Sequence, residues 1–398
     1  MDFNDAPAQA TLRSQVRTWL GENAELRSVV SADRAEDPAD IERGRAWQRR
    51  KHDSGWAGLT WPEAYGGRGL GAIDQVVWDQ EAAAFDVPEE TFVGSNMIAG
   101  PTIIDVGRPD QQAEHLPAIL DGRSIWCQLF SEPDAGSDLA GLKTRAFLDG
   151  DSWVVTGQKV WSSGAHYADW GLLLARTGSH KHAGITCFIL DMRTAGLDIR
   201  RIKQITGESH FNEVFLDGVR IPADATLGVP GDGWSVALRT LNHERLGLTF
   251  RRRVDVAAFV DLVREVPVGD RPAAAHPDIR QDVADIWMRA EAINLLGYRT
   301  LTKMARGQSP GSESSIGKLA GADLINRVGR MAVELVGAEG VWDRPDLATK
   351  WHHAFLDATA RRIAGGSDEV QRNIIGEKIL GLPREVRIAP AEGVGHAN

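Results

Sequence analysis

The chain has few of the residues that would point to an exported or metal-binding protein. Only two cysteines occur in 398 residues. Cys127 and Cys187 both lie in apolar, strand-like runs, which favours buried free thiols over a disulfide or a metal site. No apolar run reaches the length of a transmembrane helix. The N-terminal residues are acidic and then amphipathic, without the apolar core of a signal peptide. We therefore expect a cytoplasmic protein without metal or membrane contact.

Basic residues are also too few for a nucleic-acid-binding surface. The chain has 45 Lys and Arg against 55 Asp and Glu, a net charge of −10. This sign disfavours non-specific attraction to nucleic acid and to anionic membranes. Hydrophobic residues make up 42% and charged residues 25%, which is ordinary for a soluble globular protein. The length allows two or three domains with a sizeable core.

The hydrophobic periodicity changes twice and predicts three domains. Residues 1–123 have apolar residues at helical spacing, and residues 233–398 return to it. Between them, residues 124–232 contain short β-branched and aromatic segments separated by Gly, Asp and Asn. The strands expected there are 152–156, 172–176, 185–191, 197–201 and 211–219. We therefore expect an α+β fold with an N-terminal α-helical domain, a middle antiparallel β-barrel-like domain and a C-terminal four-helix bundle.

Two segments of the middle domain suit a ligand with a flat ring. Residues 128–141, QLFSEPDAGSDLAG, leave a short apolar strand and open a loop of Gly, Ser and Asp. Such a loop offers backbone N–H groups and small hydroxyls with little side-chain bulk. Residues 157–164, GQKVWSSG, place two serines beside Trp161, which suits a heteroaromatic ring with polar edges. The alternative is an ordinary β-turn and a surface tryptophan.

Both segments resemble those that wrap the flavin of FAD in the acyl-CoA dehydrogenase family. Residues 56–67, WAGLTWPEAYGG, and 212–222, NEVFLDGVRIP, resemble the family's helix connector and exit strand, and the resemblance covers nearly the whole chain. It implies the family's fold and its reaction. An α-proton leaves an acyl-CoA thioester while a β-hydride passes to flavin N5, giving a trans-2-enoyl-CoA. Electrons then pass to an electron-transfer flavoprotein.

The resemblance also implies individual contacts. The positions expected to bind FAD are Gln128, Phe130, Ser131, Ser137, Trp161, Ser163, Glu334, Gly337, Ala338, Ser367 and Glu369. The positions expected to bind the acyl-CoA are Ser137, Asn242, Arg245 and Gly366.

Two elements depart from the family pattern. In the adenosine-binding segment Glu334 replaces a Gln and Ala338 replaces a Gly, and a Glu beside a pyrophosphate would be repulsive. The family's Arg-Phe-Gly segment, which reaches FAD across a subunit interface, has no match in residues 266–272. Both departures fit an α2β2 assembly with a related chain. The segments NHER and AGGSDEVQRN resemble the actinobacterial steroid-degrading subgroup that forms such assemblies.

The reaction requires a base, because the α-proton of a thioester is only weakly acidic. Most members of the family carry a Glu near the C-terminus, and that position is Gly365 here. A minority carry it on an earlier helix, and the matching residue is Glu244 in LNHERL. Glu244 also shares a predicted apolar helix stripe with Trp234, Ala237, Leu238, Leu241 and Leu248. Burial there would raise its pKa, which suits a base near neutrality.

The absence of a side chain at Gly365 is then consistent with a role in catalysis. Without a side chain it leaves room for Glu244, and its backbone N–H, with the flavin ribityl 2′-hydroxyl, can hold the thioester oxygen. Two alternatives stay open. Glu244 is a core residue paired with Arg245 or Arg251, and Gly365 and Gly366 form an ordinary helix C-cap.

The function also has alternatives. The chain is one subunit of an α2β2 enzyme for steroid side-chain CoA esters, or an acyl-CoA oxidase that uses O₂, or a partner subunit without its own activity. We expect a tetramer, either homomeric or α2β2. The sequence leaves open the acyl chain and whether the thioester is on CoA or on an acyl-carrier protein.

Overall fold

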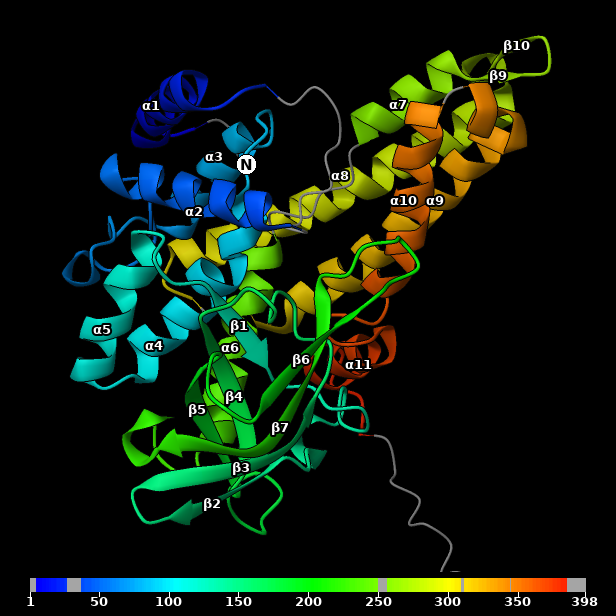
Figure 1. Ribbon diagram of the computed structural model, residues 1–398. Coiled ribbons are helices and arrows are strands. Elements are labelled where there is room, and N and C mark those ends of the chain that lie inside the picture. Colours follow the sequence, from blue (N-terminus) through cyan, green and yellow to red (C-terminus); the bar gives the residue numbers. More distant parts are fainter. Residues whose placement is uncertain (1–4, 27–36, 250–255, 309–310, 344, 385–398) are drawn as a thin grey trace, which may run out of the picture.

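The computed structural model describes residues 5–26, 37–249, 256–308, 311–343 and 345–384. Helices come first, then a β-sheet, then longer helices, so the predicted α+β fold is confirmed (Figure 1). The boundaries proposed at residues 123 and 232 stay a prediction. Over these described ranges, no helix has both the length and the apolar character that a membrane span requires.

The N-terminal part is built around buried tryptophans. Its helices are α1 (Pro7–Asn23), α2 (Pro38–Asp53), α3 (Ala72–Ala82), α4 (Gly100–Val106) and α5 (Pro109–Leu120). Trp19 contacts the rings of Trp47, Trp56 and Trp78 at centroid distances of 5.2, 6.2 and 5.7 Å. Large aromatic side chains contribute most to the burial of apolar area in a small helical core. This cluster therefore holds α1, α2 and α3 together.

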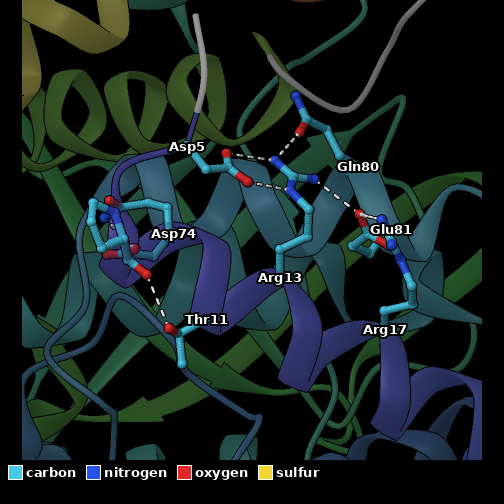
Figure 2. A network of polar contacts seen from close by, with 9 residues as sticks. Asp5, Thr11, Arg13, Arg17, Asp74, Gln80 and Glu81 are labelled. Atoms are coloured by element: carbon cyan, nitrogen blue, oxygen red, sulfur yellow. Dashed lines mark hydrogen bonds and ion pairs between the residues drawn. The ribbon is translucent and has the colours of Figure 1, made fainter.

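A polar network also joins α1 to α3 (Figure 2). Arg13 on α1 donates to Asp5, to Gln80 and to Glu81, at 2.6–3.0 Å. Arg17, one turn further along α1, donates to the same Glu81 at 2.8 and 3.0 Å. Residues four apart on a helix share one face. Both guanidinium groups therefore bind one carboxylate of α3 and fix α1 against it.

The middle part is a single sheet in the order β6-β7-β3-β2-β4-β5-β8, with β1 paired to β4. Its strands are β1 (Trp126–Leu129), β2 (Arg145–Asp149), β3 (Ser152–Lys159), β4 (Trp170–Arg176), β5 (Ile185–Asp191), β6 (Leu197–Ile202), β7 (Phe211–Pro222) and β8 (Thr226–Leu227). All five predicted strands are confirmed. The sheet is mixed rather than wholly antiparallel, because β4 runs parallel to β1 and, at one residue pair, to β2.

Both faces of the sheet are buried at its centre. Leu172 and Leu174 of β4 pack with α4, α5 and α6, whereas Leu173 and Ala175 face the opposite side. This explains why β4 is a continuous apolar run. Cys127 and Cys187 are buried free thiols, as predicted, and burial raises the pKa of each to about 12.

The C-terminal part is helical. Its helices are α6 (Gly233–Thr249), α7 (Val256–Glu265), α8 (Pro277–Ala305), α9 (Ser314–Asp343), α10 (Pro345–Arg361) and α11 (Asp368–Ile374), with a hairpin β9–β10 (Pro267–Val268, Arg271–Pro272) after α7. Helix α6 packs against the sheet, whereas α7, α8, α9 and α10 extend away from it (Figure 1). Helices α9 and α10 form a close pair. A Cβ added at Gly329 would lie 2.9 Å from the Cα of Phe355, and Asn326 Nδ2 donates to the carbonyl of Ala358 at 2.8 Å.

Candidate active site

The two motif segments of the middle part meet at the ends of β1 and β3. The N–H of Val160 donates to the carbonyl of Ser131 at 2.9 Å. The Nζ of Lys159 donates to the carbonyl of Phe130 at 3.1 Å and to Glu132 Oε1 at 2.8 Å. The structure therefore brings Phe130 and Ser131 next to the strand that leads into Trp161. Gln128, at the third position of β1, is half-buried on the same segment.

The loop after Ser131 is held in a tight turn. Glu132 and Ala135 exchange backbone hydrogen bonds of 3.2 and 3.1 Å. The Glu132 carboxylate also accepts from the N–H groups of Lys143 and Thr144. Ser137 is exposed at the tip of the loop. A Cβ added at Gly136 would meet no atom within 4 Å, so a ligand can approach the backbone there.

Trp161 has an unusual backbone and an exposed ring. Its φ is +60°, the only left-handed value at a non-glycine residue over the described ranges. Its side chain is 59% exposed, and its ring meets Phe211 edge-on at 5.6 Å. A bulky residue in this region is strained, and such strain is concentrated at functional sites. An exposed indole that is held in place despite backbone strain suits a surface that covers a ligand.

Asn212 holds the turn that contains Trp161. Its Nδ2 donates to the carbonyls of Ser162, at 2.8 Å, and His210, at 3.1 Å. The N–H of Ser162 donates to the carbonyl of Asn212, and that of Gly164 to the carbonyl of His210. Asn212 itself is fully buried. These bonds fix the residues directly after Trp161 and leave Ser163 exposed beside it.

Helix α6 carries the predicted base, and three residues of the predicted stripe pack against the core. Glu244 and Leu241 are half-buried, whereas Leu238 is 46% exposed. Ala237 of the stripe is fully buried with Val236 and Thr240 under the sheet and the first helices, and Trp234 and Leu241 pack against the same core. The prediction that Leu238 is buried was wrong, because its side of α6 borders a hollow rather than the core.

Part of the predicted base region lies outside the described residues. This applies to the side chains of Arg245 and Leu248 and to all of Arg251. The alternative of an ion pair between Glu244 and either arginine therefore stays open. The neighbouring His243 Nε2 lies 2.9 Å from Asp105 Oδ2, which ties α6 to α4.

A hollow of about 560 Å³ lies between the start of α6 and the β4–β5 turn. It is lined by His182, Ala183, Gly231, Asp232, Trp234, Ser235, Leu238, Arg239 and Asn242. The rings of Trp234 and His182 lie 5.0 Å apart. The hollow therefore combines an aromatic wall with the cationic Arg239 and includes Asn242, one of the predicted substrate contacts.

The two glycines at the more common base position form a left-handed turn. Gly365 has φ +67° and Gly366 has φ +87°. Gln371, which is 1% exposed, donates through Nε2 to both of their carbonyls, at 3.1 and 3.2 Å. A Cβ at Gly366 would lie 2.5 Å from that nitrogen, whereas one at Gly365 would meet nothing within 4 Å. Gln371 therefore fixes the turn, and the space beside Gly365 is open.

The residues after this turn begin α11. The side chain of Ser367 accepts from the N–H of Val370 and caps the helix. Asp368 is buried and accepts from Arg362 at 2.9 Å and Lys318 at 3.3 Å. Burial acts to raise the pKa of Asp368, but these two cations hold it below its usual value. Glu369 is exposed.

Glu334, Gly337 and Ala338 lie far from this turn along the α9–α10 pair. All three are exposed, and α9 is locally broken at Gly337, where φ is 60° and ψ is −178°. Because Gly329 faces Phe355, the antiparallel register places Gly337 about 14 residues before the end of α10. At 1.5 Å per residue this is roughly 20 Å. One chain therefore does not bring these positions and Gly365 to a single point.

Comparison with known proteins decides the family. Three models match the chain: the N-terminal domain of acyl-CoA dehydrogenase at residues 6–123, its middle domain at 127–219 and its C-terminal domain at 231–380. The chain belongs to the acyl-CoA dehydrogenase family. Members of this family are oxidoreductases and flavoproteins, and they generally bind FAD.

The chain is similar along almost its whole length to individual acyl-CoA dehydrogenases and to solved structures. The acyl-CoA dehydrogenase IpdE1 of Mycobacterium tuberculosis is 39% identical over 386 residues, which is 94% of this chain and 98% of that protein. Among solved structures, the Tcur3481–Tcur3483 steroid ACAD is 28% identical, with a TM-score of 0.81 over 97% of this chain and 100% of the other. The ChsE4–ChsE5 complex of M. tuberculosis is also 28% identical, with a TM-score of 0.79 and the same coverage.

The residues present fit the flavin that this family carries. An exposed indole, the adjacent Ser163 hydroxyl and the open backbone at Gly136 provide a ring surface, a polar edge and phosphate donors. Sequence reasoning named these residues but missed three buried ones that hold them: Lys159, Asn212 and Gln371. All three lie inside segments already recognised as resembling the family's. Their roles depend on contacts between segments, which a motif does not display.

Proposed function

We propose that this protein is an FAD-dependent acyl-CoA dehydrogenase that converts an acyl-CoA thioester to the trans-2-enoyl-CoA. The observation that carries the proposal is the junction of the two motif segments. It places Phe130 and Ser131 beside the strand that presents Trp161 in its strained, exposed form. This arrangement supports a site for the flavin ring.

The chain's residues have distinct tasks in this proposal. FAD, when bound, supplies the acceptor for the β-hydride. Trp161 covers the ring, and the hydroxyls of Ser131 and Ser163 donate to its polar edge. The backbone N–H groups at Gly136 and Ser137 bind phosphate oxygens, as small loops of this type do. Ser367 and Glu369 bind the remainder of the cofactor.

Glu244 accepts the α-proton in this proposal. Its half-buried position on α6 excludes part of the solvent from the proposed proton transfer. The N–H of Gly365 donates to the thioester oxygen as negative charge develops there. The open space beside Gly365 leaves room for the acyl chain and for Glu244. Gly366 contacts the thioester side of the substrate, and Arg245 is a further contact to the acyl-CoA.

The hollow at the start of α6 supports CoA as the thioester carrier. Trp234 and His182 offer aromatic surface for a purine, and the guanidinium of Arg239 offers charge for phosphates. Asn242 lies at the same hollow and binds the pantetheine. The nucleotide end of CoA therefore has a matching surface, which a protein-bound pantetheine would not use.

The assembly we propose is an α2β2 tetramer with a related chain. The separation of roughly 20 Å between Gly337 and the Gly365 turn supports a cofactor shared between two chains. Glu334 and Ala338 would then face the partner's cofactor site, where the acidic Glu334 disfavours a pyrophosphate. The likeness to a steroid ACAD favours a steroid side-chain CoA ester as substrate. The likeness to the ChsE4–ChsE5 complex favours an assembly of two different chains. An electron-transfer flavoprotein receives the electrons.

Anaerobic flavin bleaching tests this function. The protein, alone and co-expressed with candidate partner chains, is reconstituted with FAD and mixed with short, branched, long and steroid-derived acyl-CoAs. We expect a yellow tetramer whose flavin is bleached best by a steroid-derived ester. Protein that stays colourless with every partner would contradict the proposal, and rapid O₂ consumption with substrate would instead indicate an oxidase. A stable, fully flavinylated monomer in sedimentation would rule out the shared site.

A further inference from the structure

Lys159 is a buried cation for which the reaction has no direct use. It is the last residue of β3, and its side chain has no exposed surface. Its Nζ reaches Glu132 Oε1 at 2.8 Å and the carbonyl of Phe130 at 3.1 Å. Burial lowers the pKa of Lys159 to about 8, against the opposing effect of Glu132. A buried ion pair of this kind adds little net stability, since the cost of desolvation offsets the attraction between the charges. Stability alone therefore does not explain its presence.

The contacts of Lys159 surround one residue of the proposed flavin site. Phe130 and Glu132 are the two neighbours of Ser131, so a single ammonium group binds the chain on both sides of it. The Ser131 carbonyl accepts from the N–H of Val160, the residue that follows Lys159. Three hydrogen bonds therefore tie this tripeptide to residues 159–160, immediately before Trp161.

Glu132 extends this connection to the next strand. Its carboxylate accepts from the N–H groups of Lys143, at 2.6 Å, and Thr144, at 2.9 Å, directly before β2. Burial alone would raise the pKa of Glu132, but the Lys159 charge and these donors hold it below its usual value. The carboxylate is thus fixed as an anion, and it needs a cation at the position of Lys159.

We infer that Lys159, through Glu132 and the Phe130 carbonyl, is a positioning residue that sets the distance between Ser131 and Trp161 and thereby shapes the flavin site. This inference rests on the proposed function. Without the ammonium group, the tripeptide 130–132 loses two of its three hydrogen bonds to residues 159–160. The indole of Trp161 and the hydroxyl of Ser131 then no longer present one preformed surface to the ring.

A similar buried ion pair elsewhere in the chain provides a control that distinguishes a positioning role from a general effect on stability. Lys51 on α2 is 5% exposed, and its Nζ lies 2.8 Å from Glu89 Oε2. Glu89 also accepts from Trp47 Nε1 at 3.0 Å. This pair has the same chemistry and similar burial, but it lies in the N-terminal helical part. Its loss should destabilise the fold without changing the flavin site.

The test compares Lys159→Met with Lys51→Met in the full chain, with its partner where FAD binding requires one. Both variants should lower the Tm of the apo-protein. Only Lys159→Met should weaken FAD binding, by at least about tenfold, since hydrogen bonds to a charged group are lost. It should also reduce the quenching of flavin fluorescence by Trp161. FAD titration and flavin spectra measure both effects without turnover.

The double variant Glu132→Gln/Lys159→Met keeps the test informative if Lys159→Met does not fold. It removes the unpaired buried carboxylate, so we expect Tm to recover while FAD affinity stays low. Wild-type affinity and flavin spectrum in the Lys159 variants would overturn the inference, as would an equal loss of affinity in Lys51→Met. A wild-type protein that binds no FAD would instead refute the proposed function itself.

Discussion

Moving the catalytic carboxylate from Glu244 to Gly365 is the most demanding test of the proposed chemistry. Glu244→Gln preserves volume but cannot accept a proton, so substrate-dependent flavin reduction should slow by about 10²–10⁴-fold. FAD binding should be unchanged, because the segments proposed to hold the ring come from the β1 and β3 ends rather than from α6. Adding Gly365→Glu supplies a carboxylate at the position where most of the family carries one.

The structure gives the cost in stability that is expected for this rescue. A Cβ at Gly365 meets no atom within 4 Å, so a glutamate side chain has room. The φ of +67° is unfavourable for an L-residue and costs roughly 1–2 kcal/mol of stability. The strain acts on folding rather than on proton transfer. We therefore expect the double variant to be less stable than Glu244→Gln but to reduce its flavin at least about tenfold faster.

Anaerobic stopped-flow measurement of flavin reduction provides the rate, and thermal unfolding provides the stability. The control is Glu244→Gln/Gly269→Glu. Gly269 lies in the β9–β10 turn with φ +64° and nothing within 4 Å of an added Cβ, so the strain is matched without a carboxylate near the substrate. Near wild-type reduction by Glu244→Gln would show that another residue is the base. Equal rates in the two double variants would show that Gly365 does not face the same carbon.

Three further perturbations test the supports of the site. Trp161→Gly should not lower the stability of the apo-protein, because release of the left-handed strain offsets the loss of a 59% exposed ring, yet FAD titration should show weaker binding. Gly366→Ala should lower the free energy of unfolding by about 2–4 kcal/mol in denaturant melts, since the added Cβ displaces Gln371 and φ is +87°. The pKa of Glu132 is lower in the folded protein than in the unfolded chain, where it is near 4.3. This difference stabilises the fold above about pH 4.3, and the stabilisation is lost as pH falls through the folded-state pKa. Wild type should therefore lose Tm below about pH 4 more steeply than Glu132→Gln/Lys159→Met.

Much of the fold follows from local pattern. The strands 185–191 and 197–201 were predicted within one residue, because each lies between clear turn residues and is rich in β-branched or aromatic side chains. Strand β2 was missed, since Arg145–Asp149 is mostly exposed and has no apolar alternation to reveal it. The two-residue β8 is too short for any period. Its pairing with Cys187 and Phe188 of β5 is set by tertiary packing.

The candidate site was predictable to a different extent in each of its parts. Trp161 stands out as an aromatic residue beside small polar ones, whereas Gly365 was recognised only because the resemblance places the family's usual base at that position. The spacing of α6 identified Ala237 and Leu241 on the packed side but misplaced Leu238, which borders a hollow that only the packed β4–β5 turn creates. Periodicity identifies a helix more reliably than it identifies the partner of each face.

The buried polar residues that hold the site show why part of it could not be predicted from the sequence. Lys159 and Gln371 are polar residues that a hydropathy pattern assigns to the surface, yet they are 0% and 1% exposed. Each is buried because it satisfies backbone carbonyls of a segment that must hold an unfavourable shape: the Phe130–Glu132 corner in one case and two left-handed glycines in the other. A buried polar group requires such partners. The strained, exposed residues of the site therefore depend on buried polar ones, and the two kinds become linked only when the chain is folded.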